Sequence, residues 1–128
     1  MSLRRLLTTT ILSVLPAIAH HTWAGFADFD TTKTVRLSGA ISNVEFVNPH
    51  VLIYLDVKNA NGSVTIWMVE APPPAALVRM GVTKTQLAEG SNLTLDTYLA
   101  KDGSPKANGR GMILPDGRQL AISSAFSK

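Results

Sequence analysis

The chain contains no cysteine among its 128 residues, so disulfide bonds and thiolate chemistry are excluded from its fold and its function. A metal site here would have to use histidine, carboxylate or methionine side chains, or the N-terminal amine. The chain has 3 histidines, His20, His21 and His50. Their positions are therefore central to any metal-binding hypothesis.

Long apolar runs are also missing. The most apolar stretch, residues 6–15, contains three threonines and is shorter than the roughly 18 residues that a membrane-spanning helix needs. It follows two arginines and precedes Ala17 and Ala19, which is the order of a cleavable secretory signal. We expect residues 1–19 to be removed, leaving a periplasmic or secreted protein without a membrane span. An uncleaved anchor is the alternative.

A strong net charge is absent from the predicted mature chain. Removing the first 19 of the 128 residues leaves 109, a normal length for one domain with its own core. The removed segment carries two of the 12 basic residues and no acidic residue, so the net charge falls from +3 to about +1. Nucleic-acid binding typically needs a basic patch with interleaved aromatics, and we do not expect it here.

Apolar and polar residues alternate through most of the remaining sequence, which is typical of β-strands. We expect strands over residues 33–46, 50–58, 64–70, 93–99, 108–114 and 119–122. Asn61-Gly62 predicts a hairpin turn between the second and third strands. The apolar parity switches between Ile41 and Val44, which indicates a β-bulge in the first strand, with Gly39 easing the bend.

Three prolines at 72–74 end the third predicted strand, and residues 75–80 form a short predicted helix that stops at Gly81. The resulting order, β-β-β-α-β-β, is that of an OB-fold barrel, and a small β-sandwich is the alternative. We therefore predict an all-β protein: a signal peptide at 1–19, an N-terminal arm at 20–32 and a single β-barrel domain at 33–128.

Several tracts resemble those of a family of small exported bacterial proteins without an assigned function. They are His20-His21 with Trp23 nearby, residues 34–39, Asn48-Pro49-His50-Val51, and residues 114–118. The resemblance covers nearly all of residues 20–120 and implies export and one compact β domain, but no reaction. The chain departs from the family pattern at Pro72-Pro73-Pro74 and Val82, where a glycine-serine-proline-asparagine tract and a tryptophan are expected.

The histidines suggest a metal site. If cleavage makes His20 the first residue, its α-amine and ring nitrogen can close a chelate ring on one ion, and His50 can add a third nitrogen. Such a set suits copper(II) best and is similar to the histidine brace of exported copper proteins. His21 would be an auxiliary ligand. Alternatively, the histidines are only polar residues, or His50 acts with Met68 and Met80 beside Trp67.

We therefore predict an exported, copper-binding protein that stores, carries or senses the ion, with a periplasmic protein as a further expected partner. The alternative function is a non-enzymatic binding module whose face of Trp23, Tyr54 and Trp67 grips a peptide, a glycan or another protein. The sequence has no nucleophile elbow and no glycine-rich phosphate loop, so binding is favoured over catalysis.

Overall fold

The structure is a computed structural model that describes residues 28–123. Its elements, in chain order, are β1 (Val35–Glu45), β2 (Leu52–Lys58), β3 (Val64–Glu70), α1 (Pro74–Arg79), β4 (Asn92–Leu99), β5 (Lys106–Ile113) and β6 (Gln119–Ala121). Each predicted strand and the predicted helix is present. One boundary differs in a way that matters for the site, because His50 lies before β2 instead of opening it.

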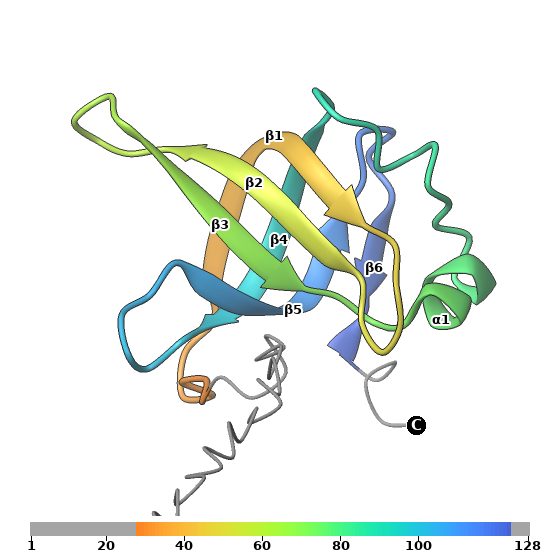
Figure 1. The fold of residues 1–128 in the computed structure, drawn as a ribbon, viewed down its shortest axis with the longest axis horizontal. Coiled ribbons are helices and arrows are strands. Elements are labelled where there is room, and N and C mark those ends of the chain that lie inside the picture. The colour runs from red at the N-terminus through yellow and green to blue at the C-terminus, as the bar shows by residue number, and fades with distance from the viewer. Residues whose placement is uncertain (1–27, 124–128) are drawn as a thin grey trace, which may run out of the picture.

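The strands form one closed barrel with β6 attached to its side. Neighbouring strands follow the order β3-β2-β1-β4-β5-β6, and an additional parallel pairing of β3 with β5 closes the ring (Figure 1). The other pairings are antiparallel. This is the strand order of an OB-fold barrel, with the helix between the third and fourth strands. The predicted small all-β barrel is confirmed, and the sandwich alternative is not adopted.

The barrel interior is filled by aliphatic side chains from alternate strand positions. Fully buried examples are Ile41, Ile53, Leu55, Val69, Leu93, Leu95 and Met112. The short helix begins with Pro74, which needs no amide hydrogen bond at that position, and adds Leu77 to the same core. Each such leucine or isoleucine contributes about 1.5–3 kcal/mol by its burial, so the core can stabilise the domain without disulfides.

The predicted bulge in β1 is confirmed, and it lies where the apolar parity switches. The pairing of β1 with β2 shifts register between Ile41 and Asn43. Gly39 has a different role, because a Cβ atom at that position would collide with the backbone carbonyl of Asp56 in β2. The bulge therefore restores the inward direction of the apolar side chains, while Gly39 lets two strands approach closely.

Part of the predicted N-terminal arm is described, and it lies along the end of β4. Phe29 forms an isolated β-bridge with Ala100, and the amide of Asp30 donates to the carbonyl of Leu99 at 2.8 Å. The arm residues from 20 to 27 and the predicted signal peptide lie outside the described residues. Within residues 28–123, no helix is long and apolar enough to cross a membrane.

Candidate functional site

His50 is held beside the end of β3 by backbone hydrogen bonds of its neighbour Val51. The amide of Val51 donates to the carbonyl of Pro72 at 3.3 Å, and the amide of Ala71 donates to the carbonyl of Val51 at 2.8 Å. These bonds extend the β2–β3 hairpin past both strand ends. They bring the connection between β1 and β2 next to the segment that leads into α1 (Figure 1).

His50 contacts a buried carboxylate. Its Nδ1 atom lies 2.8 Å from Oε1 of Glu70, and the two side chains are 26% and 5% exposed, respectively. At this distance the ring N–H can donate to the carboxylate in a charge-assisted hydrogen bond. In the neutral imidazole this arrangement puts the proton on Nδ1 and the lone pair on Nε2. The contact therefore fixes which ring nitrogen can act as a metal ligand.

Glu70 is buried because β3 has neighbours on both edges at this point. Its backbone pairs with Leu52 of β2 on one side and Asn108 of β5 on the other. Burial raises the pKa of the Glu70 carboxyl above its ordinary value, and the charge of protonated His50 opposes this rise. The second carboxylate oxygen, Oε2, is buried and has no hydrogen-bond partner among the described residues. The carboxylate is therefore only partly compensated by the residues around it.

Sequence reasoning identified His50 and missed its partner. Glu70 lies 20 positions from His50, and no local pattern in the sequence links the two residues. A signal was nevertheless present in the hairpin turn at Asn61-Gly62. Counting outward from a two-residue turn places Leu52 opposite Ala71, one residue from the observed partner Glu70, and so brings His50 to the same end of the hairpin as Glu70.

The remaining predicted metal ligands cannot be placed, since His20 and His21 lie outside the described residues, as does Trp23. Within residues 28–123, no group of three or more histidine, aspartate or glutamate side chains is arranged to hold a metal ion. The described part of the chain thus supplies one predicted ligand, His50, together with its carboxylate partner.

Tyr54 and Trp67, which were predicted to share a ligand face, lie on opposite faces of the β2–β3 hairpin. Tyr54 is opposite Met68, whereas Trp67 is opposite the buried Leu55 and packs against the core. The hydroxyl of Tyr54 donates to Oε1 of Glu45 at 2.9 Å. The two aromatic rings therefore cannot contact one ligand from the same face of the hairpin.

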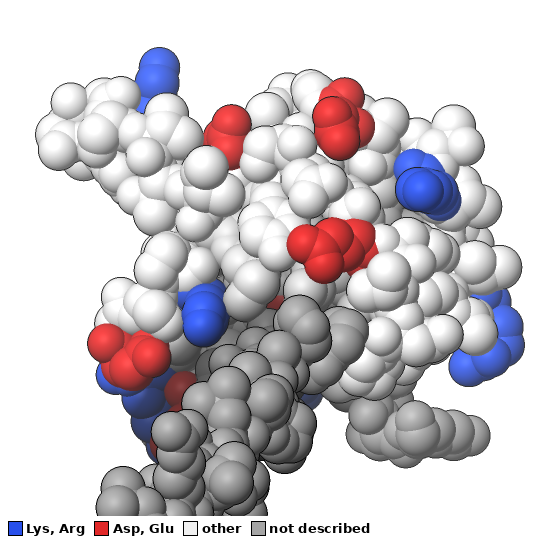
Figure 2. Space-filling view, viewed as in Figure 1, with Lys and Arg blue, Asp and Glu red and all other residues white. Residues whose placement is uncertain are grey.

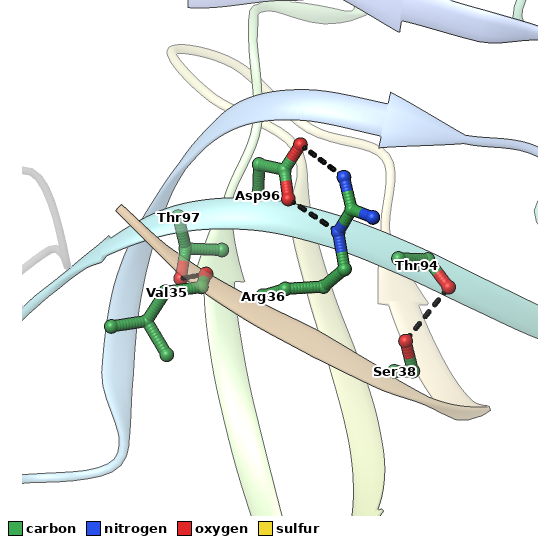
Figure 3. Close-up of polar contacts among 6 residues, drawn as sticks. All are labelled: Val35, Arg36, Ser38, Thr94, Asp96 and Thr97. Atoms are coloured by element: carbon green, nitrogen blue, oxygen red, sulfur yellow. Dashed lines mark hydrogen bonds and ion pairs between the residues drawn. The ribbon is translucent and has the colours of Figure 1, made fainter. Parts of the chain in front are cut away.

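A second polar feature crosses β1 and β4 on the outside of the barrel. Arg36 donates from Nε and one terminal nitrogen to the two carboxylate oxygens of Asp96, at 2.7 and 3.0 Å. Two residues further along β1 and two residues back along β4, the hydroxyls of Ser38 and Thr94 lie 2.8 Å apart, on the same side (Figure 3). The arginine–aspartate pair lines a shallow groove of about 410 Å³ that continues over Gly111.

Charged side chains are spread over the surface without a continuous patch on the face that Figure 2 shows. Most basic and acidic residues there are separated by uncharged surface, and red and blue side chains adjoin only at the lower left (Figure 2). Asp102 and Asp116 accept hydrogen bonds within their own turns, from the backbone amides of Ser104 and Arg118. These contacts stabilise loops.

Comparison with known proteins places the chain in a family. No curated protein matches the sequence. A family model, described as a family of unknown function (DUF6152), matches residues 9–110, which is well over half of the 128 residues. The matched range includes β1 to β4, α1 and the first half of β5. The chain therefore belongs to this family of unknown function.

Proposed function

We propose that the protein is an exported metal-binding protein that holds copper through His50 and His20, with His21 as an auxiliary ligand. The observation that carries this proposal is the 2.8 Å contact between Nδ1 of His50 and the buried carboxylate of Glu70. Metal-binding histidines usually donate their other ring N–H to a carboxylate or carbonyl, which fixes the tautomer and orients the ring. A neutral His50 held in this way would bind the ion through Nε2.

The burial of Glu70 gives a second line of support. A buried carboxylate is costly unless charge or hydrogen bonds compensate it, and Oε2 has no partner among the described residues. A cation bound by His50 would place positive charge on the far side of the imidazole ring. The Glu70 carboxyl, when ionised, would supply a compensating negative charge behind the proposed ligand.

Copper is proposed because of the donor set. An N-terminal His20 would offer its α-amine and a ring nitrogen, and His50 would add Nε2, giving three nitrogen donors without a thiolate. Nitrogen sets with planar geometry favour copper(II) among the common divalent ions. Copper bound in this way would be stored, carried or sensed. We propose this site in preference to an aromatic ligand face, because Tyr54 and Trp67 lie on opposite faces of their hairpin.

The test begins with the intact mass of the exported protein, which identifies its first residue, followed by calorimetric copper(II) titration of the same sample. We expect a terminus at His20 and uptake of one ion per chain. The substitution His50→Ala should weaken binding by more than about 100-fold, since loss of an outer-sphere partner alone costs about 10–100-fold.

Two controls make the titration specific. Val47→Ala changes an exposed residue in the same β1–β2 connection and should leave copper binding unchanged. Acetylation of the His20 α-amine should abolish tight binding, because an amide nitrogen in its place no longer offers the amine lone pair. A terminus at another residue, or copper uptake that is indifferent to His50→Ala, would overturn the proposal.

A further inference from the structure

The first half of β3 is an open edge of the barrel. Only its second half, Met68 to Glu70, pairs with β5. Between Val64 and Trp67, β3 pairs with β2 on one side, and no described strand pairs with its other side. This part of the β2–β3 hairpin projects beyond the remaining strands, at the upper left in Figure 1.

The backbone groups at this edge can be assigned from the hydrogen-bond pattern of the hairpin. The amide of Asn59 donates to the carbonyl of Ser63, and that of Ala71 to the carbonyl of Val51, so the odd-numbered residues of β3 bond to β2. Even-numbered residues therefore direct their N–H and C=O groups to the other edge. The amide of Met68 fits this pattern, because it donates to the carbonyl of Pro105 at 3.0 Å. Val64 and Ile66 are left facing the open edge.

The same two residues are the most exposed large apolar side chains of the described chain. Val64 and Ile66 are each 56% exposed, and residues 64–67 carry no charge and no proline. Proteins usually protect an edge of this kind with a lysine, a proline or a bulge, because bare edges pair with other strands. Figure 2 shows the projecting hairpin as largely uncharged surface.

We propose that this edge pairs with the same edge of a second copy of the chain, antiparallel and about a two-fold axis at Thr65. In this register Val64 of each copy faces Ile66 of the other, and each such pair can exchange both backbone hydrogen bonds. The pairing is independent of the proposed metal site. It would join the two barrels through a continuous sheet and cover the exposed side chains of both.

The charges next to the edge agree with self-pairing. In β2, Lys58 lies opposite Val64 and Asp56 lies opposite Ile66. Val64 of one copy then faces Ile66 of the second copy. The row of residues across the four strands runs from Lys58 of the first copy, through this pair, to Asp56 of the second copy. The neighbouring row has the reverse order. No like charges face each other, so charge does not oppose the self-pairing that the backbone geometry allows.

Cross-linking tests the register directly. In the proposed arrangement the two Thr65 residues form a pair without mutual hydrogen bonds, with Cα atoms about 4.5 Å apart. That separation is within the range for a disulfide bond. Because the chain has no cysteine of its own, Thr65→Cys should form covalent dimers under mild oxidation. Val78→Cys is the matched control, since Val78 is 54% exposed on α1 and should cross-link far more slowly.

Sedimentation velocity over a range of micromolar concentrations tests the dimer without cross-linking. The unmodified mature protein should dimerise, and Ile66→Lys should raise the dimer dissociation constant by about tenfold or more, because a charged side chain would replace the apolar partner of Val64 in the other copy. Val78→Lys adds the same charge away from the edge and should leave the constant unchanged. A protein that is monomeric at all concentrations, or a dimer that tolerates Ile66→Lys, would overturn the proposal, as would equal cross-linking by the two cysteine variants.

Discussion

Gly39 lies where β1 approaches the backbone of β2, and it is the residue at which a single added carbon should matter most. A Cβ atom there would collide with the carbonyl of Asp56. Since that carbonyl belongs to a strand, it cannot move without displacing β2. We expect Gly39→Ala to lower the free energy of unfolding by about 1–3 kcal/mol, the usual cost of overpacking, as measured by urea denaturation.

Gly111 provides the control for this substitution. It also lies in a strand and has an ordinary backbone conformation, but the nearest atom to its added Cβ would be a side-chain oxygen of Asp96, at 3.3 Å. A side chain can shift where a strand backbone cannot, so Gly111→Ala should cost clearly less than Gly39→Ala. Equal losses would show that the close approach at Gly39 is not what requires glycine.

The residue scale also shows what the sequence could predict about the site. His50 was recognised because histidine is rare in this chain and because Asn48-Pro49 marks the end of a strand. The contact with Glu70 depends on how the β2–β3 hairpin continues past its strand ends, and its burial depends on β5 closing the barrel against β3. This burial results from pairing between strands that are far apart in the sequence. The local alternation of apolar residues does not predict such pairing.

At the scale of elements, the sequence predicted more. Period-2 alternation and turns such as Asn61-Gly62 located the strands, because both signals are local. Gly39 was expected to ease the bend in β1, and the change of parity between Ile41 and Val44 located the bulge. The structure places it between Ile41 and Asn43. A bulge of this kind does not require glycine, whereas the contact of Gly39 with β2 does, and only the tertiary arrangement separates these two roles.

The pairing of β1 with β4 includes a pH-dependent contribution. Hydrogen bonding by Arg36 lowers the pKa of the Asp96 carboxyl below its ordinary value of 3.8. A carboxyl with a lowered folded-state pKa stabilises the fold above the unfolded-state pKa, and this stabilisation is lost as the pH falls through the folded-state value. We therefore expect Asp96→Asn to be less stable than the natural chain near neutral pH. The two proteins should be equally stable once the pH is below the lowered folded-state pKa of Asp96, where the carboxyl is protonated in both states.

Urea denaturation of both proteins across the acidic range measures this difference. It should be a small part of the total stability, because Arg36 is 61% exposed and solvent screens the pair. Arg36→Gln in the Asp96→Asn background serves as the control, since removing the second partner should then change the pH dependence little. A difference between Asp96→Asn and the natural chain that persists unchanged at the lowest pH would contradict the assignment.

At the scale of the whole molecule, the core extends beyond the range matched by the family model. The match ends at residue 110, within β5. The later residues Met112, Leu114 and Ile122 are all buried in the same hydrophobic core as β1 to β4. The barrel therefore needs the segment from 111 to 122 to complete its interior, although β6 itself pairs only with β5 along the described chain.

Ile122 allows this dependence to be measured with one substitution. Its side chain is fully buried, and its Cδ1 atom occupies the space left by Gly109, where an added Cβ would lie 3.0 Å from it. We expect Ile122→Ala to lower the free energy of unfolding by about 2–5 kcal/mol, because it leaves a cavity in the core. Val78→Ala removes atoms of an exposed residue and should change stability by no more than about 0.5 kcal/mol. If both substitutions cost equally little, the residues after β5 would be an appendage to the barrel. A large loss for Ile122→Ala in one cooperative transition would make them part of its single core.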